Sequence, residues 1–262
     1  MSLSICDDKK SIVEETAGFK IFLRDISQPM VDAWRDTQAF GCESFTDSIQ
    51  ISQGDIFQGA PAADAIVSPA NSYGFMDGGI DMVYSRHFGW QMQERLQKLL
   101  REEHDGELPV GQAVIIPAYS SLQGEGSNLS PSVNQGTPIS YLIAAPTMRI
   151  PTNVSKTVNS YLAFRAILRE VREHNRCHPD KLISSVLCPG LGTAVGRMPF
   201  MRCAHQMRTA YNAVIHRNVP AINCPRDLSE PCSAHVQLTR FGENSGTKFP
   251  PKATIGELFI EQ

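Results

Sequence analysis

The sequence has no long hydrophobic run and no large excess of one charge. A membrane-spanning helix needs about 20 consecutive apolar residues, and because no stretch approaches this length we expect no association with a membrane. The net charge of −3 gives no electrostatic field that would gather nucleic acid, so we expect no nucleic-acid partner. The first residues, MSLSICDDKKS, are acidic where a secretion signal needs an apolar run. We therefore expect a cytoplasmic protein, with the nucleus as the alternative.

The sequence also has no CxxC pair and no compact cysteine framework. Its cysteines are odd in number and scattered: Cys6, Cys42, Cys177, Cys188, Cys203, Cys224 and Cys232. This distribution predicts reduced thiols. Cys203 and His205 are too isolated for a four-ligand zinc site, and we expect neither a metal ion nor a cofactor. Cys188 has no histidine close in sequence, which favours a buried apolar role over a nucleophilic one.

The 262 residues suffice for one substantial hydrophobic core, and 42% hydrophobic with 19% charged residues is typical of a globular protein. Short apolar runs rich in Ile and Val predict buried strands. They lie at 19–23, 48–52, 63–69, 113–118, 140–147 and 182–190. Helical periodicity occurs between them, at 87–104, 155–175 and 199–216, with Ser155 as a cap and Pro199 in a first turn. This alternation predicts an α/β sheet with helices on both sides.

Two segments show no such pattern. Residues 119–138 are rich in Ser, Gly, Asn and Pro and predict a long surface loop. From Asn218 onward prolines recur and the periodicity ends. We expect an α/β domain over 1–217 and an irregular extension over 218–262 that packs on or extends the same domain.

The first candidate loop, PANSYGFMDGGIDMVYS, follows the predicted strand at 63–69. Its glycines, among them Gly78 and Gly79, allow positive φ angles and close approach to a ligand. Asp77 and Asp81 flank this flexible stretch. Such a loop can wrap a sugar while directing a carboxyl group toward it.

The second candidate loop, PGLGTAVGRMP, follows the predicted strand at 182–190 and precedes a predicted helix. Gly190, Gly192 and Gly196 can present backbone N–H groups to phosphate oxygens, or they can simply form a tight turn. A nicotinamide-dinucleotide fold would need a GxGxxG spacing in an early βαβ unit, whereas these glycines are spaced differently and come late.

Together these motifs resemble the macrodomain family over residues of about 48–215. The motifs are QGDIF at 53–57, DAIVSPANS at 64–72, GGID at 78–81 and CPGLGTAVGRMP at 188–199. The resemblance implies a macrodomain-like three-layer α/β/α sandwich with a mixed, mostly parallel central sheet. It also implies an ADP-ribose site. The implied ligand-binding residues are Asp55, Ile56, Gly79, Ile80, Gly190, Gly192, Thr193, Ala194, Val195, Gly196 and Arg197.

In the site that the resemblance implies, Asp55 accepts a hydrogen bond from adenine, the second loop surrounds the diphosphate, and Asn71 orients the distal ribose beside Asp81. Each role has a structural alternative. Asp55 could cap a turn, Asn71 could stabilise its own loop, and Asp81 could cap the helix that follows Ile80. Arg197 could grip a phosphate, pair with Asp77 or remain a solvated charge.

The sequence departs from many family members by placing Phe75, Met76 and Asp77 before the final acid, and the segment APTMRIP at 145–151 also differs. We expect a metal-independent ADP-ribosyl hydrolase in which Asp81, Asn71 and Asp77 are catalytic. Its partner would be ADP-ribose or an ADP-ribosylated protein, and we expect a monomer. The alternatives are a non-catalytic ADP-ribose reader and a phosphatase acting on ADP-ribose 1''-phosphate.

Overall fold

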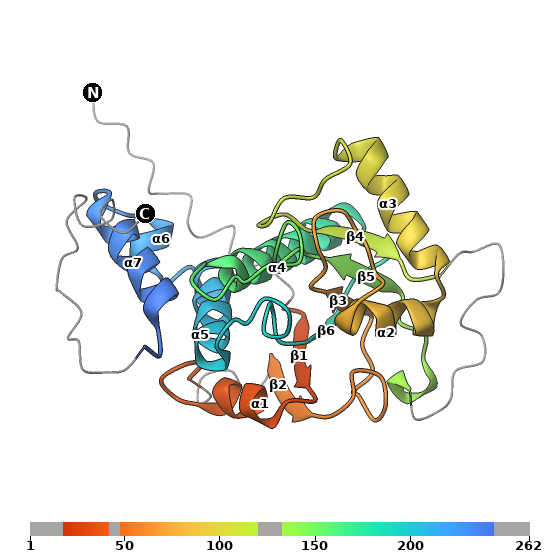
Figure 1. Ribbon diagram of the computed structural model, residues 1–262, viewed down its shortest axis with the longest axis horizontal. Helices are drawn as coiled ribbons and strands as arrows, with labels where there is room; N and C mark the ends of the chain where they lie inside the picture. The colour runs from red at the N-terminus through yellow and green to blue at the C-terminus, as the bar shows by residue number, and fades with distance from the viewer. Residues whose placement is uncertain (1–17, 42–47, 120–132, 244–262) are drawn as a thin grey trace.

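A mixed sheet forms the centre of the molecule in a computed structural model that describes residues 18–41, 48–119 and 133–243 (Figure 1). The described strands lie in the order β2-β1-β6-β3-β5-β4. Their bounds are Lys20–Asp25 (β1), Ile49–Gln53 (β2), Ala65–Ser68 (β3), Val114–Pro117 (β4), Tyr141–Ala144 (β5) and Ser185–Cys188 (β6). Neighbours are parallel except β4, which runs antiparallel to β5. The predicted strands and the mostly parallel sheet are confirmed.

Helices cover both faces of this sheet. Along β1, Ile21 and Leu23 contribute to one hydrophobic cluster and Phe22 to the other, because successive side chains of a strand point to opposite faces. The first cluster receives α1 (Gln28–Arg35), α4 (Asn159–Cys177) and α5 (Phe200–Tyr211). The second receives α2 (Gly79–Phe88) and α3 (Gln91–Glu103). The predicted three-layer α/β/α sandwich is therefore confirmed.

The predicted helices needed corrections at their ends. The helix predicted over 87–104 is interrupted at Gly89, whose φ of 89° ends α2 before α3 begins. Ser155 does not cap a helix, because α4 starts four residues later at Asn159. Pro199 lies just outside α5 as its N-cap, and α5 continues into a π-helical turn, η3 (Asn212–His216). A short 3-10 turn, η2, spans Asn134–Gly136. Among the described helices, none is long and apolar enough to span a membrane.

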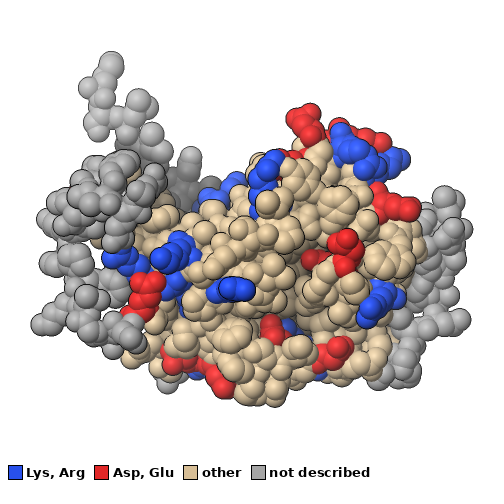
Figure 2. All heavy atoms as spheres, in the orientation of Figure 1, with Lys and Arg blue, Asp and Glu red and all other residues tan. Residues whose placement is uncertain are grey.

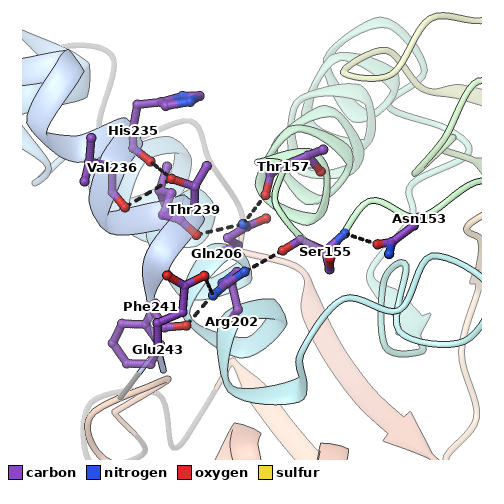
Figure 3. A network of polar contacts seen from close by, with 11 residues as sticks. Asn153, Ser155, Thr157, Arg202, Gln206, His235, Val236, Thr239, Phe241 and Glu243 are labelled. Atoms are coloured by element: carbon purple, nitrogen blue, oxygen red, sulfur yellow. Dashed lines mark hydrogen bonds and ion pairs between the residues drawn. The ribbon is translucent and has the colours of Figure 1, made fainter. Parts of the chain in front are cut away.

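The prediction of an irregular C-terminal segment is wrong for part of its length. The structure has α6 (Pro220–Asn223) and α7 (Ser229–Arg240), and α7 packs against α5. Two buried polar side chains of α5, Arg202 and Gln206, hydrogen-bond to carbonyl groups of α7 and its C-terminal turn (Figure 3). Residues 244–262, and residues 120–132 of the predicted surface loop, lie outside the described parts of the chain.

Candidate functional site

A cavity of about 610 Å³ opens where the carboxyl ends of the parallel strands meet. Its walls come from the residues that follow β1, β2, β3, β5 and β6, which is where ligands gather on sheets of this class. Figure 1 shows the loops after β3 and β6 on the side of the molecule that faces the viewer. Charged side chains are scattered over this face and do not form one continuous patch (Figure 2). Any recognition of an anion in the cavity therefore depends on local geometry.

Asp81 is a buried carboxyl group in the first turn of α2 that lines the cavity. Ser68, the last residue of β3, donates a hydrogen bond from Oγ to Asp81 Oδ1 at 2.5 Å. Burial raises the pKa of Asp81 to about 7, and the hydrogen bond from Ser68 only partly opposes this shift. Asp81 therefore bonds to the strand and does not cap its own helix. A carboxyl group that titrates near neutral pH can both give and accept a proton.

Asn71 and Asp77 belong to the loop that joins β3 to α2, and both line the cavity. The Asn71 amide oxygen accepts from the backbone N–H groups of Tyr73 (3.1 Å) and Phe75 (3.3 Å). Its amide nitrogen donates to the carbonyl oxygen of Phe75 at 2.8 Å. Asn71 thus stabilises its own loop, and one N–H of its amide is left to face a ligand. The Asp77 side chain is exposed at the mouth of the cavity.

The loop after β6 folds back on itself and leaves backbone donors free. The N–H groups of Arg197 and Met198 donate to the carbonyl oxygens of Ala194 and Gly192, each at 3.0 Å. Gly192 has a φ of +72°, and a Cβ on Gly196 would lie 2.5 Å from the Gly192 carbonyl oxygen, so both positions favour glycine. Within the described residues, the N–H groups of Gly192 through Gly196 have no hydrogen-bond acceptor. Successive free N–H groups of this kind form an anion site.

Asp55 and Ile56 follow β2 and also line the cavity. The Asp55 Oδ1 atom accepts from the backbone N–H groups of Phe57 and Gln58, both at 2.9 Å, so this oxygen caps the turn. No described residue hydrogen-bonds its Oδ2 atom, which is left for a ligand. The capping role and the predicted binding role are therefore compatible in one side chain.

Arg24 and Asp25, at the end of β1, line the cavity but were not predicted. The buried Arg24 guanidinium donates to the carbonyl oxygens of Asp55 (2.7 Å) and Gln58 (3.0 Å), which fixes the loop that carries Asp55. Burial lowers the pKa of Arg24, and the Asp55 carboxylate partly opposes this shift. Asp25 accepts a hydrogen bond from the Gly190 N–H at 3.1 Å and so positions the start of the second loop. The only sequence signal for the two residues was a charged pair at the end of an apolar strand.

The segment after β5 forms a further wall that sequence reasoning noted only as a departure from the family pattern. Thr147, Met148 and Pro151 line the cavity. Arg149 forms a two-point ion pair with Glu107, with N–O distances of 2.6 and 2.9 Å, and its guanidinium lies over the ring of Tyr73. The Arg149 carbonyl oxygen accepts from the Ser72 N–H at 3.1 Å. These contacts join the wall to the loop that carries Asn71.

The cavity brings together all the predicted site residues except Arg197. Arg197 is exposed, does not line the cavity and forms no ion pair with Asp77 or with another described residue. His87 of α2 is half-buried and stacks on Phe57, with 3.8 Å between the ring centroids. Cys188 is buried, as predicted, and burial raises the pKa of its thiol, so it is a poor nucleophile. Among the described residues, no group of three or more His, Cys, Asp or Glu is placed to hold a metal ion.

Comparison with known proteins adds a family assignment. A family model for the Macro domain matches residues 67–207, which is more than half of the chain. An uncharacterized protein of Aquifex aeolicus is 32% identical over 138 residues, covering 52% of this chain and 66% of that protein. One of Aeropyrum pernix is 29% identical over 162 residues, covering 62% of this chain and 69% of that protein.

Similar solved structures include the macrodomain of Mycobacterium tuberculosis DarG, at 20% identity and a TM-score of 0.46, covering 62% of this chain and 88% of that one. An Oceanobacillus iheyensis macrodomain with ADP is 18% identical with a TM-score of 0.45, covering 63% and 75%.

Proposed function

The chain belongs to the macrodomain family, and from this premise we propose that it binds ADP-ribose and hydrolyses the bond that joins ADP-ribose to a protein side chain or a small ester. The cavity of about 610 Å³ is within the usual range for a small-molecule site. The free N–H groups of Gly192 through Gly196 would hold the diphosphate. Asp55 Oδ2 and the Ile56 backbone, which also line the cavity, would contact the adenine.

The observation that carries the hydrolase proposal is the buried Asp81 with a pKa of about 7. In the hydrolysis, water adds to the anomeric carbon of the distal ribose while the bond from that carbon to the leaving group breaks. One proton leaves the water and one reaches the leaving group, and positive charge develops on the sugar between these events. Asp81 is suited to this proton transfer because it is partly ionised at neutral pH. Asp77, exposed at the mouth, would face the leaving group.

Binding is tested by calorimetric titration of ADP-ribose into the wild type, Ala194→Glu and Ala194→Gln. Ala194 is exposed and lines the cavity, so either side chain fits without disturbing the core. The two variants differ only in charge. We expect the carboxylate to repel the diphosphate and weaken binding at least about tenfold more than the amide does. Equal affinities of the two variants, or a folded wild type that binds no ADP-ribose, would contradict the proposed site.

Catalysis is tested by comparing Asp81→Asn with Asp77→Asn on an ADP-ribosylated protein and on a small ADP-ribose ester. General acid–base catalysis contributes about 10²–10⁴ to a rate, so Asp81→Asn should lower turnover by at least about 100-fold and change ADP-ribose affinity by only a few fold. Asp77→Asn should also lower turnover more than affinity if Asp77 acts on the leaving group. Full turnover by Asp81→Asn would exclude the acid–base role.

A second candidate function is a non-catalytic reader of ADP-ribose. The observation that favours it is the Asn71 side chain, whose oxygen is occupied by its own loop and so cannot also receive a ribose hydroxyl without rearrangement. Product analysis separates the two functions, because a reader binds the modified protein and releases nothing. A hydrolase releases free ADP-ribose and leaves the protein unmodified.

A further inference from the structure

A second pocket, remote from the cavity, is formed by arginines. Arg165, Arg169 and Arg172 follow one another on α4 at spacings of four and three residues, which places them on one face of the helix. The opposite face of α4 is buried in the core. Arg217 approaches from the turn after η3, and the four side chains surround a pocket of about 270 Å³. None of these arginines lies in the loops that line the first cavity, so the function of this pocket is a separate question.

The backbone holds Arg217 in place at a cost. Its φ of 51° is in the left-handed region, which is unfavourable for a residue with a Cβ. The N–H groups of Arg217 and Asn218 both donate to the Asn212 carbonyl oxygen and so stabilise this conformation. Asn223, which also lines the pocket, donates to the Ala213 carbonyl oxygen at 2.8 Å and joins α6 to η3. The fourth arginine is thus placed by a defined turn, whereas a flexible loop would leave its position open.

The four guanidinium groups are not bonded to any carboxylate of the described residues. In the described parts of the chain, none of them takes part in a hydrogen bond or an ion pair. Two carboxylates of α4 are near, and one of them, Glu170, interacts electrostatically with Arg169. The other, Glu173, is bonded to Arg176 and only partly offsets the positive charge around Arg172. Burial and the positive charges of Arg217 and Arg169 lower the pKa of Arg172. The arginines therefore repel one another, and an anion between them would remove that repulsion.

We propose that this pocket binds a compact polyphosphate group, either free or at the end of a nucleotide. Guanidinium groups bind phosphate oxygens through paired, charge-assisted hydrogen bonds, and the pocket has the size of a few phosphate groups. The site is separate from the proposed ADP-ribose cavity. Phe200, at the start of α5, lines the cavity, and Ala213 and Val214, after its end, line the arginine pocket. At 1.5 Å per residue these positions lie roughly 20 Å apart.

The test is calorimetric titration of inorganic pyrophosphate, and in parallel of ADP, into the Ala194→Glu protein, in which we expect diphosphate binding in the first cavity to be weakened. This protein is compared with one that carries Ala194→Glu together with Arg169→Gln and Arg217→Gly. Arg217→Gly also removes the strain of the left-handed backbone. A control adds Arg101→Gln, an exposed arginine of α3 outside the pocket. We expect the double arginine variant to weaken pyrophosphate binding about tenfold or more, and Arg101→Gln to leave it within about twofold.

If pyrophosphate and ADP bind with equal affinity, the pocket recognises the phosphate groups alone. If ADP binds more tightly, the pocket also contacts the nucleoside and the ligand is a nucleotide. No binding to the Ala194→Glu protein would overturn the proposal, as would equal losses in the pocket and control variants. A second measurement, thermal unfolding in chloride buffer, should show that pyrophosphate raises the midpoint of the Ala194→Glu protein but not that of the double arginine variant. An equal rise in both proteins would also overturn the proposal.

Discussion

At the scale of single residues, the environment of Asp81 predicts a pH-dependent stability. The pKa of Asp81 is about 7 in the folded protein and 3.8 as its ordinary value, so between these values the folded state retains a proton that the unfolded state has lost. The contribution of Asp81 to the free energy of unfolding therefore falls as the pH rises from about 4 to 7 and is constant above 7. At 1.36 kcal/mol per unit, the loss is at most about 4 kcal/mol.

Asp81→Asn, which is neutral at every pH, should remove this loss. We expect the variant to gain stability over the wild type between pH 5 and pH 8, measured by urea unfolding at both values, and to lose turnover at the same time. Asp77→Asn is the control, because an exposed side chain should show the same small difference at both pH values. If the free energies of unfolding of the wild type and Asp81→Asn change with pH in parallel, Asp81 does not retain its proton in the folded protein and this prediction is wrong.

All the residues that the sequence indicated for the site except Arg197 line the cavity, but the sequence could not choose between their alternative roles, and their part in binding stays a prediction. Asp55 and Asn71 each have the local capping bonds that the alternatives described, and each also lines the cavity. A sequence motif gives the position of such a side chain but not the bonds of its two polar atoms. Arg24 was missed because its role depends on carbonyl groups about 30 residues away in the chain, at Asp55 and Gln58.

At the scale of the elements, α5 and α7 are joined through Arg202, whose side chain is only 4% exposed (Figure 3). It donates to the carbonyl oxygens of Ser155 and Phe241 and pairs with Glu243. Arg202→Met should lower the free energy of unfolding by about 2–4 kcal/mol, because two carbonyl groups lose their donor. Glu243→Gln should cost less than about 1 kcal/mol, since Glu243 is 55% exposed. Urea unfolding measures both values. If the two variants lose the same stability, Arg202 contributes no more than its ion pair with Glu243, and the bonds to the carbonyl groups do not stabilise the fold.

The elements that sequence reasoning missed or misjudged have weak local signals. The helix α1 has eight residues and begins with a proline in its first turn, so its apolar set, Met30, Val31, Ala33 and Trp34, is too short to establish a period. In α7, only Leu238 is buried, so no hydrophobic stripe marks the helix. The break at Gly89 was hidden because apolar residues continue at helical spacing on both sides of it.

At the scale of the whole molecule, the layered architecture followed from the sequence because its strands are continuous apolar runs separated by helices. The order of the strands was not predicted, because local patterns do not determine which strands pair; the family resemblance implied only that the sheet is mixed and mostly parallel. The arginine pocket could not be predicted, because Arg217 reaches the α4 arginines through a turn whose geometry depends on Asn212 and Asn223. Contacts of this kind join segments about 50 residues apart in the chain.

The predicted domain boundary near residue 217 can be tested by comparing truncated proteins with the full chain. A protein that ends at residue 217 loses α7, and with it the carbonyl oxygens of Leu238 and Phe241 that accept from Gln206 and Arg202. These polar groups are buried in α5, so we expect the truncated protein to unfold at least roughly 10 °C lower. The matched control ends at residue 243, which retains α7 and Glu243, and should unfold within a few degrees of the full chain. If both truncated proteins unfold at the same temperature, α7 is dispensable for the fold and the unit ending at 217 is complete by itself.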